Sequence, residues 1–374
     1  MNTGIIGVSG FGARHYDDLL REVERGNATA SAACIINPEE VPEKVAKLQS
    51  LGCRIYGDVK SFFAEEKGRL DLVMIPTGIA THRPFTEMAL AAGAHVFVEK
   101  PAAATVADVA AMMAAEANAD RRVFVGFQHR YDPLTRELQQ RLLSGELGRI
   151  REVRGRGGWP RPIAYYQRNA WAGRLRQGTE PVNDAPFHNA FAHDLLTALW
   201  FASPEAGRPA EPLQVEAELY RANDIESCDT AFLHLQTDGV PVHFAFSHVS
   251  ETQMEPMIRV VGEKGELTWT HDGAWLQGRE GQTHHNCLRH EALRPVIFQN
   301  IRDVLRKNPE AGPVCSLSMA RALTRAATLA LAHPIHQVDP LHVRRLPTAD
   351  RGDRWVWDGL DARLAGFIDE TRAG

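Results

Sequence analysis

Lys100 and His193 have side chains that can transfer protons, and each has a neighbour in the sequence that could fix its conformation or orientation. Lys100 lies in Glu99-Lys100-Pro101 after an apolar run at residues 95–98; the proline holds it in an extended or turn conformation, and the bond between them could be cis. His193 titrates near neutral pH, and Asn189 lies four residues earlier, one turn away if the segment is helical. Lys100, His193 and Asn189 are therefore candidate catalytic residues that could act on a hydroxyl group. Each feature alone also fits a surface lysine beside a turn or a structural histidine.

A glycine-rich turn near the N-terminus has the pattern of a site that binds the pyrophosphate of a dinucleotide. An apolar strand at residues 3–7 runs into Gly7-Val-Ser-Gly-Phe-Gly12, and a helix-compatible segment follows. Gly7 permits a tight turn, Ser9 and Gly10 let the backbone approach a pyrophosphate, and Gly12 allows close packing of helix on strand. One glycine of the usual three is a serine, so the pattern also fits an ordinary turn between a strand and a helix.

The elements that would position these residues form two parts. Residues 1–126 alternate six strands with crossover helices, which predicts a doubly wound parallel sheet, with its ligand at the carboxyl ends of the strands. After residue 126 the chain becomes rich in strands joined by hairpins such as Asp238-Gly239. We therefore predict an α/β fold with an N-terminal Rossmann domain at 1–126. A C-terminal α/β domain with an open, mainly antiparallel sheet follows at 127–374.

The composition argues against several other classes of protein. The chain has 374 residues, is 44% hydrophobic and 24% charged, and has a net charge of −5 without a basic stripe, which disfavours nucleic acid as the main partner. No segment has the roughly 18 uncharged apolar residues of a membrane span, and the N-terminus lacks the pattern of a secretory signal. Five scattered cysteines without paired spacing favour a reduced, cytoplasmic protein.

The motifs taken together resemble the Gfo/Idh/MocA family, the relatives of glucose–fructose oxidoreductase and inositol dehydrogenase. The resemblance spans almost the whole chain and includes the glycine turn, Glu99-Lys100-Pro101, Gly126-Phe127 with Arg130-Tyr131, the segment ending at His193, and residues 262–267. It implies an NAD(P)-dependent oxidoreductase that transfers a hydride between the nicotinamide and a hydroxyl carbon of a sugar, cyclitol or related polyol. It also implies a homodimer or homotetramer, with the C-terminal domain binding substrate and forming the oligomer.

The resemblance assigns roles to named residues. In the family, the lysine of the Glu-Lys-Pro motif and the histidine of an Asp-x-x-x-His motif work beside the nicotinamide, and Lys100 and His193 match them. The residues that we expect to bind the cofactor are Gly7, Ser9, Gly10, Phe11, Gly12, Asn37, Pro76, Thr77, His82, Glu99 and Lys100. Those that we expect to bind substrate are Lys100, Arg168, Asn169, Trp171, Asp184, Asn189 and His193.

The aspartate of the family motif falls on Asn189, which is a departure. An amide cannot carry the negative charge that raises the basicity of a histidine, although it can still orient that histidine or a substrate hydroxyl. Asp184 and Asp194 are nearby acids that could substitute. Residues 184–193 also resemble a version of the motif that reads Asp-Ser-Pro-x-Asn-Asn-Ala-x-Ala-His, so we interpret Asn189 as a feature of that subgroup.

The end of the second strand bears on the choice between NAD and NADP. An acidic residue commonly stands there in NAD enzymes, but the position falls on Ile35, and no arginine or lysine is there to receive a 2′-phosphate. Asn37 can bond a ribose hydroxyl, and the acids at positions 39 and 40 disfavour a phosphate. The sequence therefore leans weakly towards NAD and does not decide between the two cofactors.

The segment at residues 165–174 has the composition of a sugar site. Its aromatic rings can stack on sugar faces, and Arg168, Asn169 and Arg174 offer planar hydrogen-bonding groups. We predict that Trp171 and its neighbours line the substrate site; the alternative is a surface excursion that packs its aromatics for stability. His284, His285 and His290 look like metal ligands, but we interpret their polar segment as a solvated loop and expect no metal.

Two other functions fit the same motifs. One is an enzyme that uses tightly held NAD transiently, so that the net reaction on a glycoside is hydrolysis, elimination or epimerisation. The other is a catalytically silent regulatory protein that responds to nucleotide and sugar; Asn189 favours it, and the intact Lys100 and His193 speak against it. In every case we expect a small-molecule ligand and no nucleic-acid or membrane partner.

Overall fold

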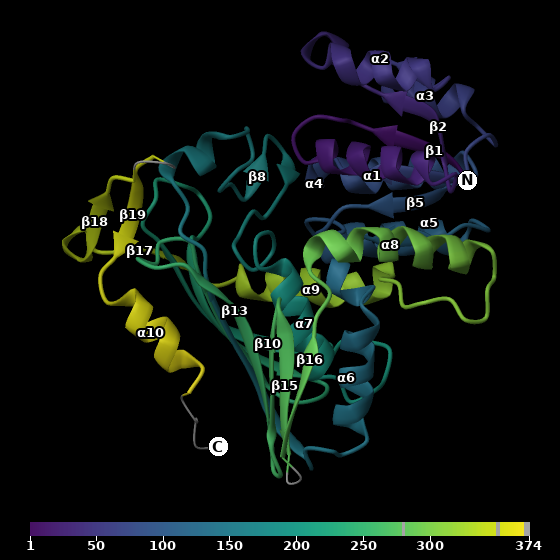
Figure 1. Cartoon of the computed structure of the whole chain (residues 1–374). Helices are drawn as coiled ribbons and strands as arrows, with labels where there is room; N and C mark the ends of the chain where they lie inside the picture. Colours follow the sequence, from purple (N-terminus) through teal and green to yellow (C-terminus); the bar gives the residue numbers. More distant parts are fainter. Residues whose placement is uncertain (279–280, 349–351, 370–374) are drawn as a thin grey trace. The chain divides into compact units, whose positions relative to one another are not determined.

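The computed structural model describes residues 1–278, 281–348 and 352–369 (Figure 1). Contacts divide the chain into two units: Met1–Tyr131 with His290–Arg321, and Asp132–Arg289 with Ala322–Gly374. The first unit therefore includes a segment, residues 290–321, that the boundary expected from the sequence places in the C-terminal domain. Within the described ranges, no helix is long and apolar enough to cross a membrane.

The first unit contains a six-stranded sheet with the strand order β3-β2-β1-β4-β5-β6, in which every neighbouring pair is parallel. The predicted doubly wound sheet is thereby confirmed. Its strands are β1 (Asn2–Ile6), β2 (Thr29–Cys34), β3 (Arg54–Tyr56), β4 (Leu72–Ile75), β5 (His95–Val98) and β6 (Val123–Val125). The helices are α1 (Gly12–Glu24), α2 (Pro42–Ser50), α3 (Val59–Glu65), α4 (Ile79–Ala91), α5 (Val106–Ala117) and α8 (His290–Leu305), with short turns η1 (Pro38–Glu40) and η2 (Gln128–Arg130). The order reverses between β1 and β4, where such sheets bind their ligands.

Ion pairs explain why α8 belongs to the first unit. Asp18 and Glu22 lie on the buried face of α1, with only 2% and 4% of their surface exposed. Arg294 of α8 pairs with Asp18, and Arg302 pairs with Glu22. Because a buried carboxylate without such a partner is costly, α8 completes the surface of α1.

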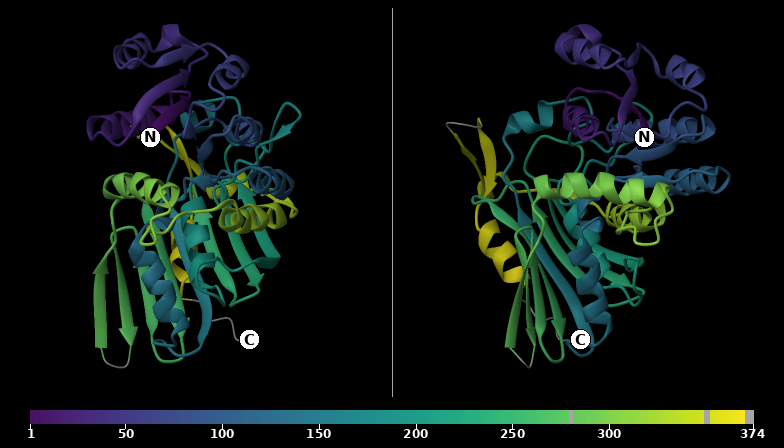
Figure 2. Two further views of the ribbon diagram at one scale, coloured as in Figure 1. Left: turned by 90° about the vertical axis from the view of Figure 1, so that its right-hand side faces the viewer. Right: turned by 45° about the vertical axis from the view of Figure 1, so that its right-hand side comes forward.

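The second unit is built on a large sheet (Figure 2). Its nine strands lie in the order β16-β15-β14-β13-β7-β12-β11-β10-β17. Only the pairs β7–β12 and β10–β17 are parallel, so the predicted mainly antiparallel sheet is confirmed. Asp238-Gly239 joins β11 to β12 in the expected hairpin. The strands are β7 (Ile150–Gly158), β10 (Pro212–Arg221), β11 (Thr230–Thr237), β12 (Val242–Ser247), β13 (Met254–Gly262), β14 (Glu266–Thr270), β15 (Gly273–Gly278), β16 (Gly281–Asn286) and β17 (Ile335–Gln337).

The segment containing His284 and His285 is a strand, β16, so its interpretation as a loop was wrong. It pairs with β15, where the ring of Trp275 stacks on that of His284 with a centroid distance of 4.9 Å. Nε2 of His285 lies 2.8 Å from a guanidinium nitrogen of Arg141. These pairings account for a polar edge strand that the sequence pattern does not distinguish from a loop.

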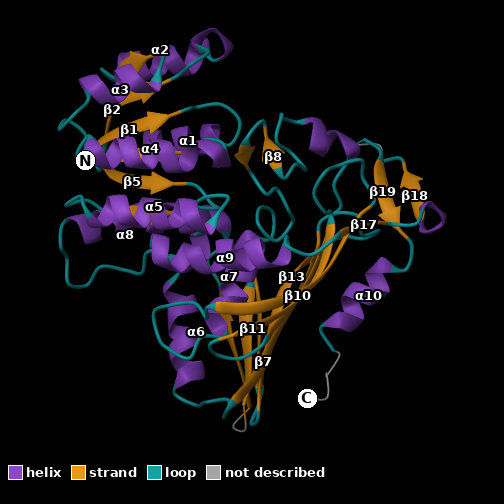
Figure 3. Ribbon diagram, turned by 180° about the vertical axis from the view of Figure 1, so that it is seen from behind, coloured by secondary structure: helices purple, strands orange, loops and turns teal. Residues whose placement is uncertain are grey.

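Helices of this unit cover both faces of the sheet. The α7 helix (Ala192–Phe201) follows Phe191, whose ring lies 5.2 Å from that of Phe246 on β12. The α10 helix (Leu360–Phe367) packs on Phe232 and Ala245, on the opposite face (Figure 3). All six residues of β12 are buried, as expected for a strand that is covered on both faces. A further helix of this unit is α6 (Pro133–Leu143), and the division between the two units falls within α9 (Leu317–Ala330).

Two short hairpins lie outside the main sheet. One pairs β8 (Arg176–Gln177) with β9 (Glu180–Pro181), and the other pairs β18 (Val343–Leu346) with β19 (Arg354–Trp357). The first follows the segment at residues 165–174, and the second carries Trp355. The first hairpin thus adjoins residues that line a pocket of this unit, and the second contributes one of them, Trp355.

Candidate functional site

The turn between β1 and α1 has the geometry of an anion-binding turn. Gly7 and Gly10 have φ angles of 84° and 54°, in the region that favours glycine. A Cβ on Gly12 would lie 2.7 Å from the carbonyl oxygen of Gly7, so only glycine lets the helix start so close to the strand. The α1 helix has no side-chain cap and no acid in its first turn, which leaves its positive end open to a phosphate. These residues fit a dinucleotide.

Several predicted cofactor residues gather at this turn. A Cβ on Gly12 would meet the ring of Pro76 at 3.6 Å, and one on Gly7 would meet Thr77 Cγ2 at 3.9 Å, so the end of β4 lies against the turn. Phe11 is 53% exposed at the start of α1. Lys44 of α2 donates from Nζ to the Val8 carbonyl at 2.6 Å. No motif marks Lys44 in the sequence; only the fold brings it to the turn.

Glu99 is buried and connects Lys100 to the glycine turn. His15 Nε2 of α1 lies 2.6 Å from Glu99 Oε1, and the backbone N–H of Lys100 donates to Glu99 Oε2 at 3.1 Å. Burial alone would raise the pKa of Glu99, but His15 and the charges of Arg294 and Lys100 lower it to about 2. The ionised carboxylate therefore fixes the backbone of Lys100 relative to α1.

His82 joins the ends of β4 and β5. The Lys100–Pro101 bond is cis, and the carbonyl of Pro101 lies 2.9 Å from His82 Nδ1. His82 Nε2 lies 3.0 Å from the carbonyl oxygen of Thr77. Burial lowers the pKa of His82, so the ring is neutral and donates to one carbonyl at a time. The predicted cofactor residue His82 thus holds two loops of the site together.

The end of β2 differs from the usual ribose site in its side chains. Ile35 is buried and Ile36 is 74% exposed. Asn37 donates from Nδ2 to Glu40 Oε1 at 2.9 Å, which leaves its carbonyl oxygen as the group available to a ribose hydroxyl. The carboxylates that follow in η1 place negative charge beside this position.

In the second unit, Asn189 contacts a carboxylate. Asn189 lies in the turn before α7, and its Nδ2 donates to Asp184 Oδ1 at 2.7 Å. His193 is half-buried in the first turn of α7. Asp194, the other acid considered from the sequence, is bound instead to His271, with Oδ1 2.8 Å from Nε2. Asp184 is therefore the acid that contacts Asn189.

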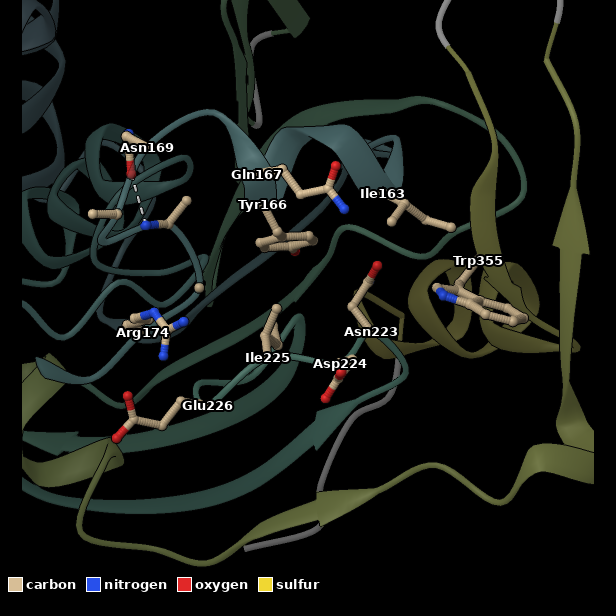
Figure 4. Close-up of a pocket in the computed structure, with 13 residues that line it drawn as sticks. Ile163, Tyr166, Gln167, Asn169, Arg174, Asn223, Asp224, Ile225, Glu226 and Trp355 are labelled. Carbon is tan, nitrogen blue, oxygen red and sulfur yellow. Dashed lines mark hydrogen bonds between the residues drawn. The ribbon is translucent and has the colours of Figure 1, made fainter. Parts of the chain in front are cut away.

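A pocket of about 790 Å³ opens in the second unit (Figure 4). Among the predicted substrate residues it includes Asn169, whose Oδ1 accepts a hydrogen bond from the Ala172 N–H at 2.8 Å. Arg168 and Trp171 are not in its lining; the Arg168 guanidinium stacks 3.6 Å from the centre of the Tyr165 ring. The lining residues are Ile163, Tyr166, Gln167, Asn169, Ala170, Ala172, Gly173, Arg174, Asn223, Asp224, Ile225, Glu226 and Trp355.

Gly173 closes the wall of this pocket. Its φ is 69°, and a Cβ there would lie 2.7 Å from Ile225 Cγ2. Its carbonyl accepts the N–H groups of Glu226 and Ser227 at 3.1 and 2.9 Å. The two loops that line the pocket are thus joined by the backbone. Among the residues that the structure describes, no group of three or more His, Cys, Asp or Glu side chains is placed to hold a metal.

Comparison with known proteins gives matches to both parts of the chain. Residues 1–127 match the oxidoreductase family with an NAD-binding Rossmann fold, and residues 135–268 match the GFO/IDH/MocA C-terminal domain. Inositol 2-dehydrogenase 2 of Saccharopolyspora erythraea is 30% identical to this chain over 345 residues. That match covers 90% of this chain and 93% of the relative.

Solved structures share the two-part fold. The WlbA dehydrogenase from Bordetella pertussis, in complex with NADH and UDP-GlcNAcA, has a TM-score of 0.68 at 23% identity, over 88% of this chain and 94% of that one. Levoglucosan dehydrogenase, in complex with NADH and levoglucosan, has a TM-score of 0.71 at 14% identity, over 89% and 96%. Together with the sequence matches, they place this chain in the Gfo/Idh/MocA family of NAD(P)-dependent oxidoreductases.

Proposed function

We propose that the protein transfers a hydride between NAD(P) and a hydroxyl carbon of a cyclitol, sugar or related polyol. The observation that carries this proposal is the extent of the match to an inositol 2-dehydrogenase, which includes 90% of the chain. Lys100 and His193 stand at the positions that the family uses beside the nicotinamide. The same match supports a small neutral substrate rather than a macromolecule.

The proposed chemistry divides between two residues and the cofactor. His193 takes the proton of the substrate hydroxyl, and Lys100 donates a hydrogen bond to the same oxygen as negative charge develops on it. A bound nicotinamide would supply the hydride acceptor for oxidation of the carbinol carbon to a carbonyl. Glu99 supports this step by fixing the backbone of Lys100.

The cofactor site favours NAD. The glycine turn and the open end of α1 would hold the pyrophosphate, with Pro76 and Thr77 beside them. Glu39 and Glu40 would repel a 2′-phosphate near Asn37, while Lys44 places a positive charge at the glycine turn.

The remaining predicted site residues would act on the substrate. Asn189 and Asp184 would orient the reacting hydroxyl or His193, and Arg168, Asn169 and Trp171 would bind the remaining hydroxyls.

We also propose a homodimer or homotetramer. Because α10 already covers part of the second sheet face, the oligomer would use the remaining surface of that unit.

The test is a steady-state assay of NADH formation with myo-inositol, D-chiro-inositol, glucose and a neutral glycoside. Wild-type protein should reduce NAD with at least one polyol, and Lys100→Ala should lose turnover while it still binds NADH. Full activity of Lys100→Ala with the true substrate would refute the assignment. Conversion of the glycoside without net NADH would select transient oxidation instead.

A further inference from the structure

Asp184 is a buried carboxylate that contacts three parts of the second unit. It is 6% exposed. Its Oδ1 accepts from Asn189 Nδ2 and its Oδ2 from the Gly173 N–H, both at 2.7 Å. The Arg168 guanidinium lies 3.8 Å from Oδ2. The carboxylate thus connects the wall of the pocket to the turn that leads into α7.

This contact fixes the orientation of the Asn189 amide. The oxygen and nitrogen of an amide are otherwise interchangeable by rotation of the side chain. An ionised carboxylate only accepts hydrogen bonds, so the group facing Asp184 is Nδ2, and Oδ1 of Asn189 faces away from it. The contact therefore fixes which end of the amide is the acceptor: Oδ1 of Asn189 lies on the side away from Asp184.

The contact also restores a negative charge next to position 189. The family motif places an aspartate at this position, and this chain has an amide. The charge has moved five residues along the chain, to Asp184, and remains one hydrogen bond from the residue at position 189. The other nearby acid, Asp194, contacts His271 through its Oδ1.

We propose that Asp184 is the positioning acid of the catalytic site, and that it acts on the reaction through Asn189. It holds Oδ1 of Asn189 as an acceptor for His193 and supplies the negative charge that stabilises the protonated form of His193. Asp184 then touches neither substrate nor cofactor. This inference rests on the proposed function for its kinetic consequence, but the coupling to His193 can be measured without turnover.

The decisive experiment exchanges the two side chains. Asp184→Asn removes the charge, and the double variant Asp184→Asn, Asn189→Asp moves it to position 189. In the double variant the amide at 184 can still accept a hydrogen bond from the Gly173 N–H, and the bond between positions 184 and 189 persists with its direction reversed. We expect kcat to fall roughly 100-fold in Asp184→Asn, the lower end of what a positioned acid–base group contributes. The double variant should recover most of it.

The second readout is the titration of His193, followed by NMR of histidine-labelled protein and assigned with His193→Gln. Removing a nearby carboxylate should move its titration midpoint to lower pH in Asp184→Asn, and the exchange should move it back. The acid limb of the pH dependence of kcat/KM should shift in the same direction. A purely structural Asp184 would change stability without moving either quantity.

A matched control comes from a second aspartate–asparagine pair of the same unit. Asp229 is buried and accepts hydrogen bonds from Nδ2 of Asn223, at 2.8 Å, and from two backbone N–H groups. Asp229→Asn should lower the unfolding temperature and leave the His193 titration unchanged.

Three outcomes would overturn the proposal. The His193 titration midpoint could stay unchanged in folded Asp184→Asn, or kcat could fail to recover in the double variant. The third is that Asp229→Asn shifts the His193 midpoint as much as Asp184→Asn does. If the wild type oxidises no polyol, the proposed function fails, while the titration still decides whether Asp184 is coupled to His193.

Discussion

Substitution of Gly12 by alanine tests the cofactor turn most sharply within the first unit. The added Cβ would lie 2.7 Å from the carbonyl oxygen of Gly7 and 3.0 Å from its carbonyl carbon. Ordinary carbon–oxygen contacts begin at about 3.3 Å. The start of α1 must therefore move away from the end of β1 by about 0.6 Å, and the atom in the way is backbone that cannot rotate aside.

The size of the effect follows from this overlap. Forcing extra volume into a well-packed position costs about 1 to 3 kcal/mol. If the turn moves to relieve it, the phosphate-binding N–H groups move as well, and the cost appears in cofactor affinity. Since about 1.4 kcal/mol corresponds to a tenfold change, NADH should bind roughly 5- to 150-fold more weakly.

The assay is a fluorescence titration with NADH, using energy transfer from the chain's seven tryptophans. Gly57→Ala is the control, because a Cβ at Gly57 meets nothing within 4 Å and its φ is not positive. It should bind NADH as the wild type does, and both variants should show a native thermal transition. Wild-type affinity in Gly12→Ala would refute the argument that this turn holds the pyrophosphate.

Three further predictions concern substrate, pH and packing. Trp171→Ala should raise KM for the polyol roughly tenfold without changing NADH affinity; unchanged steady-state kinetics would exclude residues 165–174 from the substrate site. Burial lowers the pKa of His248 to about 3, below its ordinary value of about 6.5. The neutral ring therefore stabilises the fold fully above pH 6.5 and progressively less as the pH falls towards 3. The difference in free energy of unfolding between wild type and His248→Gln should narrow from pH 7 to pH 4; a constant difference would contradict this. Asp18→Asn leaves Arg294 buried without its ion pair and should cost about 3 kcal/mol in urea unfolding; a loss below about 0.5 kcal/mol would mean that α8 does not depend on that pair.

The two-part fold was predictable because its signals are local. The glycine turn, the apolar strands and the Asp238-Gly239 hairpin are each set by a few neighbouring residues, and the structure confirms them. The association of α8 with the first unit was not predictable, since it depends on Asp18 and Glu22. Their positions in the sequence suggest a solvated helix face, and only a helix nearly 280 residues later explains their burial.

In the candidate site, residue types could be read from the sequence, whereas the contacts of each side chain depend on the fold. Residue types identified Lys100, Asn189 and His193, and those roles stay predictions until activity is measured. The direction of each side chain was beyond the sequence: Asp184 and Asp194 were equal candidates for the missing acid, and the bonds to Asn189 and His271 separate them. The ring nitrogens of His82 face two backbone carbonyls, and its predicted role in binding the cofactor stays a prediction.

Direct observation of substrate-dependent NADH formation tests the central claim. Purified protein, NAD and each polyol of the panel would be followed at the absorbance of the reduced nicotinamide, with Lys100→Ala measured beside the wild type. We expect NADH formation with at least one cyclitol or sugar, and its loss in Lys100→Ala at unchanged NADH affinity. Tight NADH binding without turnover on any polyol or glycoside would contradict the proposed enzyme and leave a nucleotide-responsive regulatory protein.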